Sequence, residues 1–246
     1  MKSLNTKILL VMLLSVIGAK VLAQEYVIDF AVEYDDGSKF WFSYINEGKD
    51  LGIVMGGGSE SGILNIPEEV TYMNRTRKVT AICKKAFIDN TYISSVNIPN
   101  SVNDIGDYAF YGCSGLSSLT IPNSVKTIGE SAFAYCKGLT SLTIGNGLER
   151  VDGTAFWGCE SINTVYITDM ESWCKSPGYY VWGDNKSLYI NGNEIKDIFI
   201  PENVEKIPGS RFSGFNITAV TFSKSVKEIG PYCFNNCTNL SSLIIP

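Results

Sequence analysis

The sequence contains no histidine in its 246 residues. This absence excludes Ser-His-Asp and Cys-His nucleophilic sites, zinc sites with imidazole ligands, and the most common general base of enzymes. The carboxylates do not compensate, because they fall in variable, solvated positions rather than forming a pair that flanks a cleft. We therefore predict that the chain is not an enzyme and holds no cofactor or metal.

Basic residues are also few. The chain has 20 Lys and Arg against 25 Asp and Glu, a net charge of −5. Without the first 23 residues, which contain three lysines, the balance is 17 against 25, a net charge of −8. Phosphate and anionic lipid both require clustered basic residues, and the sequence has no such cluster. We predict no nucleic-acid partner and no electrostatic attachment to a membrane.

Long apolar runs are missing except near the N-terminus, at residues 8–17. This run is too short to span a bilayer comfortably, follows Lys2 and Lys7, and precedes Val21 and Ala23 at the usual positions before a cleavage site. We predict that residues 1–23 are a secretory signal peptide. The mature chain is then soluble, does not insert into a membrane, and is secreted or held at the cell surface. An uncleaved N-terminal membrane anchor is the alternative.

A period of 23 residues organises most of the chain. It is clearest in three consecutive copies, which start at Ile98, Ile121 and Ile144. Less regular copies start at about Ile66, at Ile200 and at Phe222. A single copy cannot bury its own apolar face, so successive copies have to stack and share a continuous core.

Within each copy the pattern L-x-x-L-x-I predicts one short parallel strand. Alternation points Leu119 and Ile121 inward and their polar neighbours outward. Pro122 ends this strand, because proline cannot donate to a ladder. We expect a second extended piece at residues 125–128, then a helical or 3₁₀ turn that lays Phe133 into the core.

The consensus I-P-x-S-V-x-x-I-G-x-x-A-F-x-x-C-x-x-L-x-S-L-x resembles the BspA-like leucine-rich repeats of bacterial surface proteins. The resemblance covers residues 63–246, most of the mature chain. It implies a right-handed, curved leucine-rich-repeat solenoid of short parallel strands. It also implies a secreted or cell-surface location, adhesion to host or bacterial partners, and no catalytic residues.

Residues 24–62 do not follow the repeat. Residues 26–34 alternate, residues 35–38 are a turn signal, and residues 40–45 are an aromatic, β-prone run. We predict a β-hairpin that caps the open end of the core, as stacked repeats require. The glycines at 56–58 are expected to form a bend or flexible loop. At the C-terminal end, the last residues match the beginning of another copy of the repeat. We interpret this match as a sign that the sequence is a fragment of a longer protein. The alternative is that a partner covers the last strand.

The spacing jumps from 23 to 33 residues between Ile167 and Ile200, which places an insertion at residues 168–199. Insertions in solenoids loop out, often on the binding face, and exposed aromatic side chains are typical anchors for proteins and sugar rings. The candidates here are Trp173, Tyr179, Tyr180 and Trp182. The other reading, which we favour for the cluster, is that these rings fold back and fill the gap left by an irregular copy. Residues 189–194 are expected to form a small hairpin.

The seven cysteines are not arranged as a disulfide framework. Four occupy the same position of different copies: Cys113, Cys136, Cys159 and Cys237. Stacked strands lie about 4.8 Å apart, whereas a disulfide needs Cβ atoms about 3.5–4.5 Å apart. We predict a ladder of small buried thiols, with Cys174 alone free to react or pair.

The outward strand positions carry hydroxyl groups and almost no charge. The candidate binding residues are Ser118, Thr120, Ser141, Thr143, Thr164 and Tyr166. They indicate a hydrogen-bonding surface on the concave side, suited to protein or glycan; alternatively, Ser and Thr are simply compatible with a solvated strand. The sequence thus predicts a binding or adhesion protein with a protein ligand on a host or bacterial surface. A structural spacer for other domains and an accessory glycan-binding protein are the alternatives.

Overall fold

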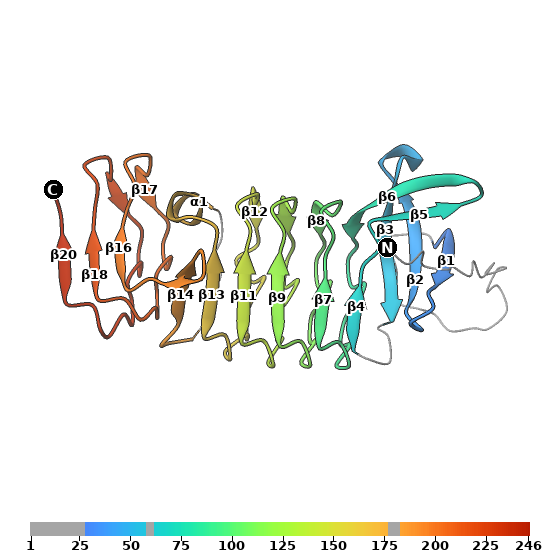
Figure 1. The fold of residues 1–246 in the computed structure, drawn as a ribbon, viewed down its shortest axis with the longest axis horizontal. Coiled ribbons are helices and arrows are strands. Elements are labelled where there is room, and N and C mark those ends of the chain that lie inside the picture. Colours follow the sequence, from blue (N-terminus) through green and yellow to red (C-terminus); the bar gives the residue numbers. More distant parts are fainter. Residues whose placement is uncertain (1–27, 58–61, 177–182) are drawn as a thin grey trace.

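The computed structural model describes residues 28–57, 62–176 and 183–246. In Figure 1 the strands of successive copies stand side by side along one long axis, from β4 near the N-terminal end to β20 at the C-terminal end. The chain is a solenoid in which each copy contacts its neighbours. The predicted signal peptide lies outside the described residues.

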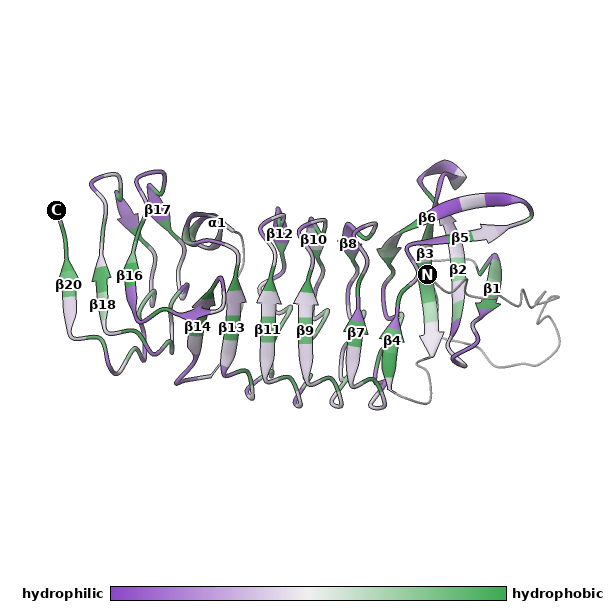
Figure 2. Cartoon of the chain, in the orientation of Figure 1, coloured by the Kyte–Doolittle hydropathy of each residue, from purple (hydrophilic) through white to green (hydrophobic). Residues whose placement is uncertain are grey.

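The strand predicted from the leucine pattern forms the main sheet. Its strands are parallel and in register, so that Leu142 lies between Leu119 and Val165. Side chains alternate between buried and outward along each strand, as the banding in Figure 2 shows. In spatial order the parallel strands are β4 (Ile63–Asn65), β7 (Ser95–Asn97), β9 (Ser118–Ile121), β11 (Ser141–Ile144), β13 (Thr164–Ile167) and β14 (Ser187–Ile190).

A second sheet is built from the shorter extended pieces. Ile105, Ile128 and Val151 pair in register and point into the core. This confirms the expected second extended piece in these three copies. The strands are β3 (Asp50–Gly57), β6 (Arg75–Ile82), β8 (Asp104–Ile105), β10 (Thr127–Ile128) and β12 (Arg150–Val151).

Hydrogen-bonded turns stand where a helical or 3₁₀ turn was expected. Ser131 and Tyr135 have positive φ angles of 50° and 59°. The amides of Phe133 and Tyr135 donate to the carbonyls of Ala155 and Trp157 in the next copy, at 2.8 and 2.7 Å. A 3₁₀ turn would direct these amides to its own carbonyls. The turns instead add a third ladder of hydrogen bonds between copies.

The phenylalanines of successive copies line up in the shared interior. Phe87, Phe110, Phe133 and Phe156 are buried, and their neighbouring ring centroids lie 5.0, 5.2 and 5.3 Å apart. The rings are nearly parallel, with interplanar angles of 12°, 4° and 8°. This stack confirms the predicted common core.

The predicted ladder of thiols lies beside the phenylalanines. The Sγ of Cys113 donates to the carbonyl of Phe87 at 3.2 Å, and the Sγ of Cys136 donates to that of Phe110 at 3.2 Å. Burial raises the pKa of the Cys113 thiol to about 12. The seven cysteines are all buried, so these side chains act as small core residues.

The N-terminal cap is a hairpin, as predicted. β1 (Phe30–Glu33) and β2 (Lys39–Ile45) are antiparallel, and the turn between them is closed by a hydrogen bond from the amide of Tyr34 to the carbonyl of Ser38. The short 3₁₀ helix η1 (Asn46–Gly48) leads to β3, which joins the cap to β6. The Phe40 ring lies 6.3 Å from that of Phe87, at the end of the phenylalanine stack.

Gly56 and Gly57 belong to β3, so the bend or flexible loop expected from them is wrong at these two positions. A Cβ on Gly56 would lie 2.3 Å from the ring of Phe87. Glycine therefore lets the cap approach the first ring of the stack. Gly58 lies outside the described residues.

A second hairpin was not predicted. β5 (Glu69–Tyr72) pairs antiparallel with β6. The hairpin projects from the solenoid next to the cap and is mostly hydrophilic (Figures 1 and 2).

The expected insertion keeps the register of the main sheet, but the helix α1 (Met170–Lys175) stands where the regular copies have their second strand. β14 pairs in register with β13, with Ser187 opposite Thr164, so the spacing of 23 residues continues. The additional residues fall between Ile190 and Ile200, where β15 (Asn193–Glu194) folds back onto β14 as the predicted hairpin. The parallel stacking then resumes in β16 (Asp197–Phe199), β17 (Lys206–Ile207), β18 (Ala219–Thr221), β19 (Glu228–Ile229) and β20 (Ser242–Ile244).

Candidate binding surface

The six strand candidates lie together on the outward side of β9, β11 and β13. The register places them in two rows, with Ser118, Ser141 and Thr164 in one and Thr120, Thr143 and Tyr166 in the other. We call these six residues the hydroxyl platform. The β9 members are exposed and the others are half-buried.

Two kinds of hydroxyl occur along this face. Just before the strands, the hydroxyls of Ser117 and Thr140 each donate to a main-chain carbonyl of the preceding copy, at 3.1 Å. These two hydroxyls stabilise the stacking. Among the residues that the structure describes, the platform hydroxyls of β9 and β11 have no protein partner. They are available to water or to a ligand.

The platform continues on β14, which the sequence analysis did not include. Ser187 and Tyr189 extend the two rows, and the ring centroids of Tyr166 and Tyr189 lie 4.9 Å apart with an interplanar angle of 31°. The Ser187 hydroxyl donates to a carboxylate oxygen of Glu194 at 2.7 Å. The spacing of 23 residues from Thr164 and Tyr166 was the signal that could have identified them.

Trp173 is not part of any exposed surface. It lies on α1 (Met170–Lys175), which begins at Asp169, whose carboxylate accepts a hydrogen bond from the amide of Ser172 at 2.7 Å. The indole is only 3% exposed, 6.2 Å from the ring of Phe215, with the guanidinium of Arg211 4.8 Å from its centroid. The candidate role of Trp173 as an exposed anchor is therefore wrong, and the favoured reading of a ring folded back into the core holds for this residue, because α1 turns its apolar side into the core.

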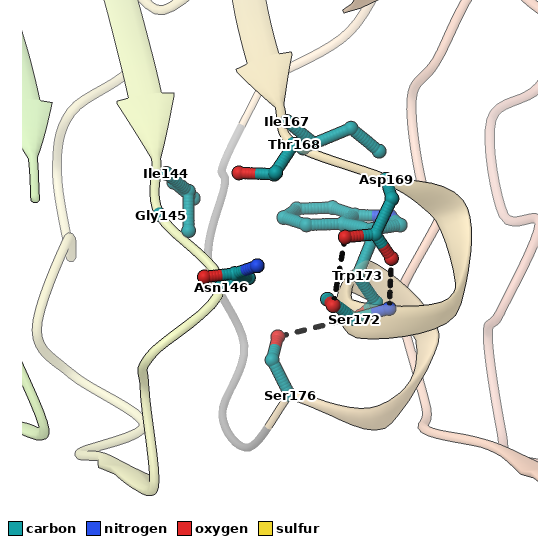
Figure 3. Close-up of a pocket in the computed structure, with 9 residues that line it drawn as sticks. All are labelled: Ile144, Gly145, Asn146, Ile167, Thr168, Asp169, Ser172, Trp173 and Ser176. Atoms are coloured by element: carbon teal, nitrogen blue, oxygen red, sulfur yellow. Dashed lines mark hydrogen bonds between the residues drawn. The ribbon is translucent and has the colours of Figure 1, made fainter. Parts of the chain in front are cut away.

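The prediction for Cys174 is wrong for the same reason. This thiol is buried beside Trp173 on α1, and burial raises its pKa to about 12. The cavity next to α1, between Asn146, Asp169 and the indole, measures about 10 Å³ (Figure 3). It has room for one water molecule and not for an organic ligand. The other three aromatic candidates, Tyr179, Tyr180 and Trp182, lie outside the described residues.

Neither a metal centre nor a membrane span is visible in the described ranges. Within residues 28–57, 62–176 and 183–246, no three Cys, Asp or Glu side chains come together as metal ligands. The helices of these ranges lack the length and apolar character needed to cross a membrane.

The repeat matches the repeat of a known protein family. The model of the BspA type leucine-rich repeat region matches residues 65–177 and 185–246 in six copies. The chain belongs to the BspA-type leucine-rich-repeat family. None of the curated protein sequences matches it significantly.

Several solved structures are similar to this BspA-type chain. A leucine-rich repeat protein from Bacteroides capillosus is 30% identical over 53% of this chain and 94% of that chain, with a TM-score of 0.49. A leucine-rich cell surface protein from Faecalibacterium prausnitzii is 22% identical over 84% and 74% of the two chains, with a TM-score of 0.42. A leucine-rich repeat protein from Bacteroides ovatus is 21% identical over 89% and 70%, with a TM-score of 0.40.

Proposed function

We propose that this BspA-type protein is a secreted or cell-surface binding protein that holds a protein ligand, of host or bacterial origin, on the hydroxyl platform. The observation that carries the proposal is the geometry of that face. Two uncharged rows of side chains run across neighbouring strands and end at the Tyr166–Tyr189 pair.

The composition of this face favours a protein ligand. Tyr and Ser dominate the binding loops of antibodies, because Tyr supplies a large amphipathic contact at low entropic cost and Ser supplies adaptable hydrogen bonds. The platform has both, on strands that are fixed by pairing on each side. Tyr166 and Tyr189 are therefore the expected anchors, and the unpartnered hydroxyls are the surrounding contacts.

Export and the absence of catalysis are parts of the same proposal. Residues 1–23 have the features of a cleaved signal peptide, which would deliver the solenoid to the outside of the cell. The sequence has no histidine, and the platform hydroxyls have no base beside them in the repeat pattern, so the face is suited to binding rather than to reaction.

The test introduces charge into the platform without disturbing the core. The variant Thr120→Lys/Thr143→Lys changes two outward side chains of β9 and β11, and the matched control Thr221→Lys changes the equivalent outward position of β18. Residues 24–246 and both variants are applied to an array of host extracellular and bacterial surface proteins. We expect a ligand of the wild type to bind the double variant at least about tenfold more weakly and the control unchanged.

Thermal unfolding of the three proteins accompanies the array, since an exposed Thr→Lys change in a strand costs less than about 1 kcal/mol. A ligand that binds the double variant as well as the wild type would contradict the proposal. The absence of any ligand would favour a structural spacer. The glycan alternative loses one of its supports, because Trp173 is buried.

A further inference from the structure

A second exposed surface lies on the turns rather than on the strands. Four aromatic side chains, here called the aromatic strip, occur on the turns that follow β8, β10 and β12: Tyr108, Tyr111, Tyr135 and Trp157. The ring centroids of Tyr108 and Tyr111 lie 5.7 Å apart, and those of Tyr111 and Tyr135 lie 5.4 Å apart. Tyr135 is 39% exposed and Trp157 is 46% exposed. The rings of Tyr108, Tyr111 and Tyr135 are therefore contiguous over two successive copies, and Trp157 lies on the equivalent turn of the third.

The fold does not require rings at these positions. Tyr111 and Trp157 each follow the buried phenylalanine of their copy, and the residues at the same place in later copies are Ser213 and Asn235. These polar residues occupy turns of the same kind. A group of solvent-accessible rings at positions where the same repeat also accepts polar residues indicates an interaction site.

Tyr135 is also unfavourable for its own turn. Its φ angle is 59°, in the left-handed region that disfavours bulky side chains. The equivalent positions of other copies, also at positive φ, hold Asp89, Gly112, Gly158, Gly214 and Asn236, residue types that tolerate this conformation. The ring is only partly covered, by Tyr111 and Gly158, and remains 39% exposed. Such an outlier is a reason to look for a function.

The surroundings of the rings define the chemistry of a partner. The ring of Tyr135 lies against Gly158, where a Cβ would come within 2.8 Å of the ring. The hydroxyl of Tyr108 donates to the carboxylate of Glu130, and the Asp107 carboxylate accepts a hydrogen bond from the Glu130 amide at 2.9 Å. Apolar ring faces thus lie next to carboxylate acceptors, along a line rather than around a pocket.

We propose that the aromatic strip binds a neutral polysaccharide. Pyranose rings present apolar C–H faces that fit aromatic rings and hydroxyl groups that donate to carboxylates. An extended chain of such units suits a linear strip, whereas a protein ligand is anchored in desolvated pockets. The flanking carboxylates disfavour an anionic polysaccharide. The strip and the hydroxyl platform lie on different segments of each copy, so this proposal stands or fails independently of the proposed function.

The test replaces tyrosines of the aromatic strip with the residues that occupy the equivalent turn positions in other copies of this chain. The variant Tyr111→Ser/Tyr135→Asn introduces the residues found at Ser213 and Asn236, and the matched control Tyr232→Ser removes a tyrosine that is 74% exposed and equivalent to Tyr108. Migration of residues 24–246 is measured in native gels that contain a soluble β-glucan, a galactomannan or an arabinoxylan. We expect retardation of the wild type and the control in at least one gel, and about a tenfold weaker retardation of the double variant.

Thermal unfolding separates binding from stability. Because Tyr135→Asn relieves the left-handed tyrosine, the unfolding temperature of the double variant should equal or exceed that of the wild type. Three results would overturn the proposal: no retardation of the wild type in any of the three gels, equal retardation of wild type and double variant, or a marked fall in the unfolding temperature, which would make the rings structural. Loss of a protein ligand by the double variant without any retardation would likewise assign the strip to a protein interface.

Discussion

At the scale of single residues, the phenylalanine stack joins neighbouring copies through direct ring contacts. Phe133 is fully buried between Phe110 and Phe156. Phe133→Ala should reduce the free energy of unfolding by about 3–5 kcal/mol, because it leaves a cavity in contact with two other copies. The control Phe199→Ala removes a ring that is 56% exposed and should cost less than about 1 kcal/mol. Chemical denaturation measures both, and equal costs would contradict the shared core.

Lys186 is a buried lysine, and keeping it charged in the core reduces the stability of the fold. Its side chain is fully buried, its Nζ lies 5.1 Å from the Phe215 ring centroid and donates to the carbonyl of Gly183, and burial lowers its pKa to about 8. An unfolded lysine has a pKa of about 10.4. Between these two values the unfolded chain binds more protons, so this residue makes stability rise with pH.

Lys186→Met should therefore stabilise the protein by about 1–3 kcal/mol below pH 8, and the gain should fade as the pH approaches 10. Unfolding temperatures of wild type and variant, measured from pH 6 to pH 10, give this profile. The exposed, ion-paired Lys206 supplies the control, since Lys206→Met should change stability little. A lower unfolding temperature for Lys186→Met at pH 7 would show that the buried amine stabilises the fold.

At the scale of elements, the turns depend on close backbone contact between copies. A Cβ on Gly138 would lie 2.3 Å from the carbonyl oxygen of Ser114 in the preceding copy, whereas a Cβ on Gly57 would meet nothing within 4 Å. Gly138→Ala should cost about 1–3 kcal/mol, because two main chains would have to separate. Gly57→Ala should be neutral or slightly stabilising. If both changes have the same effect on the unfolding temperature, the turns do not stack as described.

The elements show which parts of the structure could be predicted from the sequence. The strands and the phenylalanine stack follow from spacing alone, because every copy presents the same alternation to its neighbours. The left-handed turns at Ser131 and Tyr135 do not, because neither residue type favours that conformation. Hydrogen bonds to the next copy impose it.

The candidate site also contains residues that could be predicted from the sequence and residues that could not. The platform residues could be placed because a strand points alternate side chains outward. Trp173 was misplaced because an aromatic residue in an irregular segment looks the same in the sequence whether it is buried or exposed. Tyr189 was missed as a platform residue because the long spacing after Ile167 was taken as one insertion, although β14 keeps the regular register.

At the scale of the whole molecule, the interior is occupied by stacked side chains, and the described part has no cavity suited to an organic ligand beside α1. The two surfaces with distinctive chemistry are the hydroxyl platform on the strands and the aromatic strip on the turns. They lie on different segments of the same repeating unit, so variants of one surface leave the other unchanged and the two proposals can be tested separately.

The most direct test of the account is hydroxyl-radical footprinting of residues 24–246 with and without a captured protein ligand. The account predicts that Tyr166 and Tyr189 become protected from oxidation, while Tyr92, which is 87% exposed away from the platform, reacts as before. Unchanged oxidation of Tyr166 and Tyr189 in the complex would contradict the assignment of the binding surface.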